Sequence, residues 1–126
     1  MEKIVCNKQS KGDAMIKRIG IYSISAETDE KEWWQYHTRE HAADFVKAAG
    51  EDLVKYVINR VTKVIKGEKI CFGIVETWYQ DEAAMKRVYD RCYQTILPNG
   101  KNIDDDYFSR VVNPRSYAVE EFVVKD

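Results

Sequence analysis

The chain has 126 residues, of which 44% are hydrophobic and 12% aromatic, and this is enough to fill the core of one domain. Its 20 basic and 21 acidic residues nearly cancel, so neither nucleic acid nor an anionic membrane is an expected partner, and the expected ligand is a small molecule. Three scattered cysteines form no CxxC pair, and the sequence has neither a signal peptide nor a long apolar run, which together predict a cytoplasmic protein.

The first half of the chain predicts an extension, a strand and a helix. Residues 1–14 show no periodicity and are interpreted as an N-terminal extension, which leaves one domain over residues 15–126. Residues 16–25 are rich in β-branched and aromatic side chains, which favours a strand. Asp29 followed by Glu32 has the form of a helix N-terminal cap, and Gly50 fits a left-handed C-terminal cap, so a helix is expected between them.

The second half predicts a hairpin, two helices and a last strand. Residues 53–64 and 70–80 have strand composition, and the turn between them is expected at residues 66–69. Asp81 can cap a second helix that stops at residues 98–100, and residues 103–112 can form a short irregular helix. Asn113-Pro114 is expected to break the chain before a last strand at residues 116–124.

This order of elements is the split βαβ pattern. It predicts an α+β, ferredoxin-like βαββαβ fold, with a four-stranded antiparallel sheet and helices on one face. Successive residues of a strand point to opposite faces of the sheet, and here both faces carry apolar side chains. Ile19 and Ile21 alternate with Tyr22, and Ile74 alternates with Val75. Because two helices can cover only one face, we expect a homodimer packed sheet to sheet, as in a dimeric α/β barrel.

Two histidines lie on the apolar side of the predicted first helix. His37 and His41 are four residues apart, so both could line one cavity, although each could also be a core histidine bonded to a carbonyl. The segment also matches the H-x-x-E-H signature of zinc proteases. We interpret this match as accidental, because a third ligand from a second helix and a substrate cleft have little room here. A two-histidine metal site completed by Glu76 stays open.

The strands supply further candidates for pocket walls. Tyr56 and Arg60 share one face of the second predicted strand, and Glu76 and Trp78 share one face of the third. Glu76 lies within an apolar strand, where it either forms a salt bridge to Arg60 or Lys63 or faces the ligand as a proton acceptor. Aromatic residues are dense enough for a flat organic ligand, although aromatic cores look the same in sequence: Tyr22, Trp33, Trp34, Tyr36 and Trp78.

Short motifs carry a family resemblance that runs from about residue 15 to residue 124. They are residues 15–19, the pattern Trp33-x-x-Tyr36-His37-x-x-x-His41-Ala42, Lys55-Tyr56 with Asn59-Arg60-Val61, Asp105 with Phe108, and residues 120–124. With these motifs the chain resembles the EthD family of dimeric α/β barrels, which includes muconolactone isomerases and polyketide-tailoring dehydratases or decarboxylases. The resemblance implies that His41 faces the pocket and that Tyr56 lines it. His37 stands where the family commonly has a tryptophan, which makes this pocket more polar.

The resulting hypothesis is cofactor-free proton transfer on a cyclic or aromatic metabolite, as in a lyase or isomerase. His41 would act as general base or acid and Tyr56 would orient the substrate oxygen, because the pKa of histidine lies near working pH. The ligand-binding residues are predicted to be His37, Tyr22, Trp34, Arg60, Glu76 and Trp78, with no cofactor and no metal. The alternatives are an oxidoreductase such as a small monooxygenase, and a non-catalytic metabolite- or haem-binding module in which His41 would ligate the iron.

Overall fold

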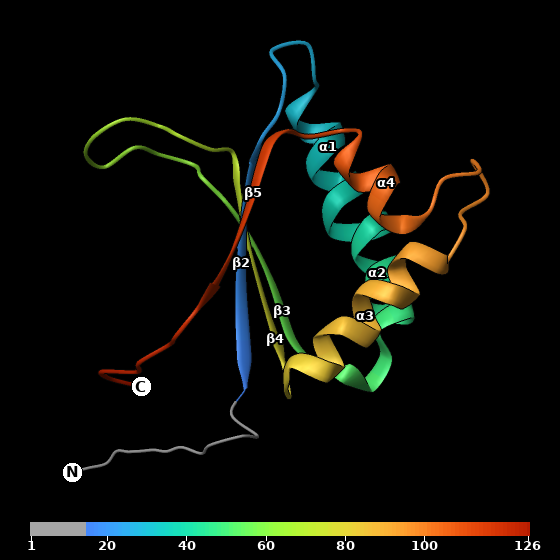
Figure 1. Ribbon diagram of the computed structural model, residues 1–126. Coiled ribbons are helices and arrows are strands. Elements are labelled where there is room, and N and C mark those ends of the chain that lie inside the picture. The colour runs from blue at the N-terminus through green and yellow to red at the C-terminus, as the bar shows by residue number, and fades with distance from the viewer. Residues whose placement is uncertain (1–14) are drawn as a thin grey trace.

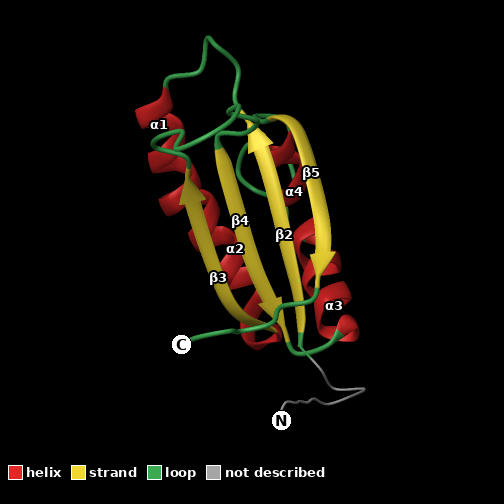
Figure 2. Cartoon of the chain, turned by 90° about the vertical axis from the view of Figure 1, so that its left-hand side faces the viewer, coloured by secondary structure: helices red, strands yellow, loops and turns green. Residues whose placement is uncertain are grey.

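The computed structural model describes residues 15–126, in which a four-stranded antiparallel sheet has the order β3-β4-β2-β5. All helices lie on one face of this sheet (Figures 1 and 2). The predicted α+β ferredoxin-like architecture is therefore confirmed. The predicted extension at residues 1–14 lies outside the described residues. The strands are β2 (Ile16–Ser23), β3 (Leu53–Arg60), β4 (Gly73–Tyr79) and β5 (Val112–Val119).

The first helical segment is divided by a π-helical turn. It consists of α1 (Glu30–Gln35), the π-helix η2 (Tyr36–His41) and α2 (Ala42–Ala49), and it is followed by a short 3-10 turn, η3 (Gly50–Asp52). The Asp29 side chain accepts a hydrogen bond from the Glu32 amide at 2.9 Å, so this predicted cap is confirmed. Gly50 ends α2 with a positive φ of 60°, as predicted, but its ψ of −143° lies outside the left-handed helical region, so the predicted left-handed cap is wrong in its conformation.

Side-chain and backbone hydrogen bonds together explain the π-helical turn. The Thr38 hydroxyl donates to the Trp34 carbonyl at 2.7 Å and competes with the backbone amide that would normally bind there. The Ala42 amide binds the His37 carbonyl, one residue further back than in an α-helix. Such turns inside α-helices occur frequently at functional sites, and this one contains both histidines.

The predicted hairpin is correct in its pairing but wrong in its length. β3 ends at Arg60, which pairs with Gly73 at the start of β4, and residues 61–72 form the connecting loop seen at the left of Figure 1. Ile65, which lies next to the predicted turn, is 94% exposed. β-branched residues stabilise a strand mainly by packing on a half-buried face, and residues 63–70 have no such face in this chain.

The last strand begins earlier than the sequence predicted. β5 begins at Val112 and ends at Val119, whereas the prediction was residues 116–124. Within residues 15–126, β5 lies at the edge of the sheet and pairs only with β2, so Pro114 is tolerated inside this strand. Asn113 adopts a φ of 52°, and the pairing register shifts beside it between Ile21 and Ser23, which indicates a bulge.

Two further helices pack against the first. The predicted cap of α3 (Glu82–Gln94) is confirmed, since Asp81 accepts a hydrogen bond from the Ala84 amide at 2.8 Å. This helix was expected to stop at residues 98–100, but α3 already ends at Gln94, and Ile96 beyond it is 63% exposed. The short helix α4 (Ile103–Phe108) ends before residue 112 because β5 starts there.

The core consists of two clusters that flank the space between the helices and the sheet. One cluster centres on Phe45, Tyr79 and Val88, and the other contains Tyr22, Trp33 and Phe72. α3 is fixed to the end of α2 by Arg91, which donates to the Ala48 and Ala49 carbonyls at 2.7 and 2.6 Å. Over residues 15–126, no helix combines the length and the apolar character that crossing a membrane requires.

Candidate functional site

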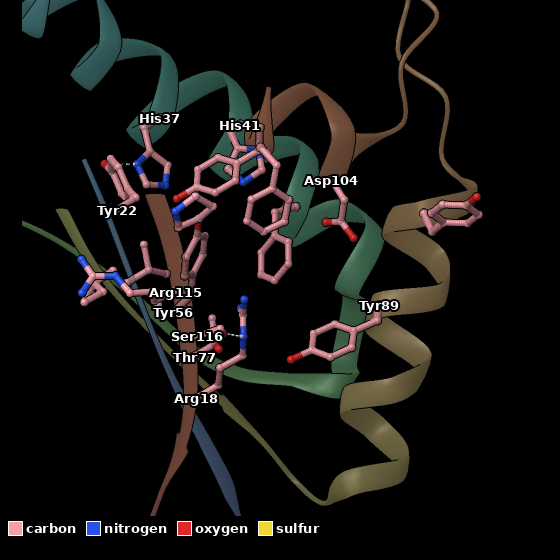
Figure 3. Close-up of a pocket in the computed structure, with 18 of the residues that line it drawn as sticks. Arg18, Tyr22, His37, His41, Tyr56, Thr77, Tyr89, Asp104, Arg115 and Ser116 are labelled. Atoms are coloured by element: carbon pink, nitrogen blue, oxygen red, sulfur yellow. Dashed lines mark hydrogen bonds between the residues drawn. The ribbon is translucent and has the colours of Figure 1, made fainter. Parts of the chain in front are cut away.

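A cavity of about 580 Å³ lies between the helices and the sheet (Figure 3). Its volume is in the range of small-molecule binding sites. All four strands and the helical segments contribute side chains to its wall. Those used below are Arg18, Tyr22, His37, His41, Phe45, Tyr56, Asp104, Tyr107 and Ser116.

His37 is completely buried at the wall of this cavity, with 0% of its surface exposed. Its Nδ1 atom lies 2.8 Å from the Tyr22 hydroxyl, which also accepts a hydrogen bond from Trp33 Nε1 at 3.0 Å. Its other ring nitrogen, Nε2, has no hydrogen-bond partner among the described residues. Burial, with a smaller contribution from His41, lowers the pKa of His37 to about 3, so the ring is neutral at neutral pH.

His41 lies beside His37, with ring centroids 5.5 Å apart, and is 8% exposed. The Tyr107 ring stacks on it at a centroid distance of 4.5 Å. Burial lowers the pKa of His41 to about 4, although Asp106 opposes this shift and Arg110 adds to it. The expectation that the His41 pKa lies near working pH is therefore wrong for the cavity without a ligand, because burial disfavours the charged ring. The neutral imidazole can still accept a proton from a bound molecule whose developing negative charge offsets the cost of burying the imidazolium.

Asp106 connects α4 to the turn that carries the histidines. It accepts hydrogen bonds from the Tyr36 hydroxyl, from Asn99 at 2.8 Å and from Arg110 at 3.1 Å. Burial alone would raise the pKa of Asp106, but these three donors outweigh burial and lower it. The resulting carboxylate fixes Tyr36, and with it the helical turn between Tyr36 and His41.

Two tyrosines supply neutral hydroxyl groups to the cavity. Burial is the main cause that raises the pKa values of Tyr56 and Tyr107 above the usual range of a phenol. Tyr56 packs on Phe45 at a centroid distance of 4.9 Å. Both hydroxyls therefore stay protonated and can donate a hydrogen bond to a ligand oxygen.

Arg18 brings a positive charge into the cavity from the central strand β2. Figure 3 shows its side chain pointing between the sheet and α3, while Arg115 points away from the cavity. The Arg18 Nε group donates to Ser116 Oγ, and no carboxylate within residues 15–126 lies at ion-pairing distance from its guanidinium. Asp104 also lines the cavity, and its burial raises the pKa of its carboxyl group.

The structure brings together four of the predicted site residues at the cavity wall, namely His41, Tyr56, His37 and Tyr22. Trp34 and Arg60 do not line the cavity. They pack on each other at the end of β3, with the guanidinium carbon 4.9 Å from the centroid of the indole ring. The prediction that Arg60 shares the pocket wall with Tyr56 is wrong because Arg60 lies at the far end of β3, two pleats beyond Tyr56, where the strand extends past the cavity.

Glu76 and Trp78 are also absent from the cavity wall, because strand alternation places them on the opposite face from Thr77. Lys17 binds Glu76 at 2.9 Å and Glu121 at 2.8 Å, and Trp78 donates to Glu121 at 3.1 Å. The partner of Glu76 is therefore Lys17 rather than Arg60 or Lys63. The hydrogen bond from Lys17 is the largest cause that lowers the pKa of Glu76.

The position of Glu76 also answers whether it could complete a metal site with the two histidines, which the sequence left open. Glu76 cannot complete a site with the two histidines, since the sheet separates them. Glu40 of the H-x-x-E-H segment is exposed on the helix surface. In the part of the chain that the structure describes, no three His, Cys, Asp or Glu side chains are grouped so that they could hold a metal ion.

Sequence reasoning missed Arg18, Asp104 and Tyr107 as cavity residues. A usable signal existed for Arg18, which shares strand parity with Tyr22 and so faces the helices. No periodic signal placed Tyr107, because α4 is too short to define a face.

No protein-family model matches the chain, and no curated protein matches it either. Solved structures do match. They include an EthD family protein from Bacillus halodurans, with a TM-score of 0.61 and 19% identity over 86% of this chain and 99% of that one. A dimeric ferredoxin-like protein of unknown function from Thermobifida fusca has a TM-score of 0.61 and 12% identity over 83% of this chain and 89% of that one. A mutant of SnoaB, a cofactor-independent oxygenase from Streptomyces nogalater, has a TM-score of 0.56 and 11% identity over 88% of this chain and 98% of that one. These similarities agree with the fold that the family resemblance implied.

Proposed function

We propose that the protein catalyses cofactor-free proton transfer on a cyclic or aromatic metabolite bound in this cavity. The observation that carries the proposal is the position of His41, a neutral and nearly buried imidazole at the wall of a cavity large enough for such a ligand. The resemblance to isomerases and dehydratases of the EthD family points to the same chemistry.

In the proposed step, His41 takes a proton from a carbon next to a ligand carbonyl. The electron pair of that C–H bond forms a C=C double bond, and the π pair of the carbonyl moves to its oxygen. When the resulting enolate is conjugated with a further double bond, it takes the proton back from His41 at the distant carbon, which isomerises the ligand. When the ligand has a hydroxyl group on the neighbouring carbon, the enolate expels it, and this group takes the proton from His41 and leaves as water, which dehydrates the ligand. Tyr56 would orient the oxygen, and Arg18 at the cavity wall would supply a positive charge that stabilises an anionic ligand.

We also propose that the protein acts as a homodimer packed through the face of the sheet that carries no helices. Apolar residues such as Ile74 and Tyr117 lie on this face and are partly or largely exposed. The similar Thermobifida fusca protein is described as dimeric. Such packing would bring two sheets together as a barrel and leave each cavity on its own side.

Hydrogen exchange tests the catalytic proposal without knowledge of the natural substrate. With 2-tetralone as the probe in deuterated buffer, we expect the wild-type protein to accelerate exchange of the hydrogens next to the carbonyl, as followed by proton NMR. His41→Gln should reduce this acceleration by about 100-fold or more. Glu40→Gln, an exposed change on the same helical turn, should leave it unchanged. Equal exchange by His41→Gln and wild type, with matching near-UV circular dichroism, would contradict the proposal.

A second candidate function is cofactor-independent oxygenation, which is favoured by the similarity to an oxygenase of that kind. Deprotonation by His41 would again come first, and the resulting carbanion would then add dioxygen, which is the oxidant. The peroxide anion formed would take the proton back from His41, and the hydroperoxide would lose water to leave one oxygen atom in the product as a carbonyl. Oxygen consumption with phenolic probes such as 1-naphthol separates the two candidates. Consumption that depends on His41 would favour oxygenation, and exchange without oxygen consumption would favour isomerisation or dehydration.

A further inference from the structure

We infer that His37 donates a hydrogen bond from Nε2 to an oxygen of the bound ligand, and that Trp33 and Tyr22 are positioning residues that fix the tautomer in which Nε2 carries the proton. The ligand part of this inference rests on the proposed function, whereas the tautomer part does not. The two histidines would then have different roles, with His41 as the base and His37 as the donor.

A count of donors and acceptors around Tyr22 determines the tautomer. Trp33 Nε1 can only donate, so the Tyr22 oxygen is the acceptor of that 3.0 Å hydrogen bond. One proton lies between Tyr22 and His37 Nδ1, which are 2.8 Å apart. If Tyr22 donates it, His37 Nδ1 is the acceptor and Nε2 carries the ring proton.

The opposite assignment leaves more groups unsatisfied. If Nδ1 donated to Tyr22, the buried Tyr22 hydroxyl proton would have no acceptor among the described residues, and Nε2 would be an unpaired acceptor. The first assignment leaves only the Nε2–H group unpaired. Because each buried unsatisfied polar group costs about 1–3 kcal/mol, the first assignment is the stable one. Burial also raises the pKa of Tyr22 to about 12, which keeps its hydroxyl proton in place.

The sheet contains a built-in space for Tyr22. A Cβ atom added at Gly73 would lie 2.3 Å from the Tyr22 Cζ atom and 2.5 Å from its hydroxyl oxygen. Gly73 therefore allows the Tyr22 ring to pass over β4 and place its hydroxyl against His37. The φ angle of Gly73 is not positive, so this close approach, rather than backbone conformation, requires glycine here.

The unpaired Nε2–H group indicates the chemistry of its partner. His37 is fully buried at the cavity wall, and Figure 3 shows the ring nitrogen that is not bonded to Tyr22 on the side away from that residue. A carbonyl or enolate oxygen would satisfy this donor, and its hydrogen bond would strengthen as negative charge develops on the oxygen. The ligand class is therefore a cyclic ketone, lactone or phenol that becomes an oxyanion when deprotonated.

Nitrogen NMR tests the tautomer directly, and the chain contains only two histidines to assign. In the wild-type protein we expect the His37 proton on Nε2 and an unprotonated Nδ1. Tyr22→Phe removes the donor to Nδ1 and should give a mixture of tautomers. Tyr107→Phe removes the hydroxyl of a ring that packs against His37 at a centroid distance of 5.1 Å, but it leaves the Trp33–Tyr22 pair intact and should not change the tautomer. A proton on Nδ1 in the wild type, or an unchanged tautomer in Tyr22→Phe, would overturn the inference.

Two glycine variants test the positioning role. Gly73→Ala should displace Tyr22 and give the same mixture of tautomers as Tyr22→Phe. Gly20→Ala is the matched control, because its added Cβ would meet only the Arg115 carbonyl oxygen at an ordinary 3.8 Å. A single Nε2–H tautomer in folded Gly73→Ala would show that Tyr22 does not need this space, and would overturn the positioning role.

The donor role is tested with 4-nitrophenol, whose phenolate is followed by its absorbance. We expect bound 4-nitrophenol to ionise about tenfold more readily in the wild-type protein than in His37→Phe. His37→Gln retains an N–H donor and should recover part of the difference, which a purely structural role would not explain. Binding with equal ionisation in all three proteins overturns the donor role alone. If the wild-type protein does not bind the probe, the proposed function and the donor role both fail, while the tautomer result stands separately.

Discussion

The ring of His41 stacks on that of Tyr107, with centroids 4.5 Å apart and planes 23° from parallel. The two residues are far apart in sequence and are brought together by α4, which Asp106 ties to Tyr36 at the start of the π-helical turn. Tyr107 covers the imidazole and keeps water from much of its surface. The chemical state of His41 therefore depends on a residue of another helix.

Removing this cover should change the titration of His41. In Tyr107→Ala, water reaches the imidazole, so its pKa should rise from about 4 toward 6.5. The cavity left in the core should also reduce the free energy of unfolding by about 3 kcal/mol. NMR titration measures the pKa, and Tyr107→Phe, which keeps the ring, should leave it low. An unchanged pKa in Tyr107→Ala would show that Tyr107 does not control the state of His41.

The stability of the protein should fall as the pH is lowered from about 6.5. Burial lowers the pKa values of His37 and His41 in the folded state to about 3 and 4, while in the unfolded chain they titrate near 6.5. Below 6.5 the unfolded state binds more protons than the folded state, so each histidine reduces stability by up to about 1.4 kcal/mol per pH unit. Both contributions are fully present above pH 6.5; that of His41 is lost as the pH approaches 4, and that of His37 as the pH approaches 3.

Urea unfolding at pH 7.5 and pH 5 measures this dependence. Because carboxylates also titrate in acid, the control is the double variant His37→Gln, His41→Gln. Its free energy of unfolding should change less between the two pH values than that of the wild type. An equal change in both proteins would mean that the histidines are not neutral and buried in solution.

Arg18 should select anionic ligands. Arg18→Gln is expected to weaken the binding of benzoate by about tenfold, or about 1.4 kcal/mol, and to leave the binding of benzyl alcohol nearly unchanged. Lys17→Gln makes the same change of charge at the next residue, but on the opposite face, where Glu76 and Glu121 pair with the lysine. Titration calorimetry compares the three proteins. Equal losses in Arg18→Gln and Lys17→Gln would show that only net charge matters.

The proposed dimer should be sensitive to a charge on the face of the sheet without helices. Ile74→Arg places a cation on this face and should convert the dimer to a monomer in light scattering after size-exclusion chromatography. Val46→Arg makes a comparable change on the exposed surface of α2 and should leave the dimer intact. A dimer that persists in Ile74→Arg would locate the interface elsewhere.

Local patterns allowed most of the fold to be predicted. The caps at Asp29 and Asp81 were confirmed, because a capping side chain and the amide it binds lie within three residues of each other. The inward position of His37 and His41 followed from helical periodicity in the same way. Where strands end depends on neighbours that are distant in sequence, so the lengths of β3, β4 and β5 were predicted poorly.

The sequence by itself determined the order of the elements and the inward side of the first helix, because both follow from interactions between residues a few positions apart. Only the tertiary structure decided that Glu76 and Trp78 lie on the face away from the helices, since strand alternation gives two faces and does not say which of them the helices cover. The stacking of Tyr107 on His41 and the hydrogen bond between Tyr22 and His37 also arise only in the tertiary structure. The pKa values and the tautomer that define the site arise from these long-range contacts.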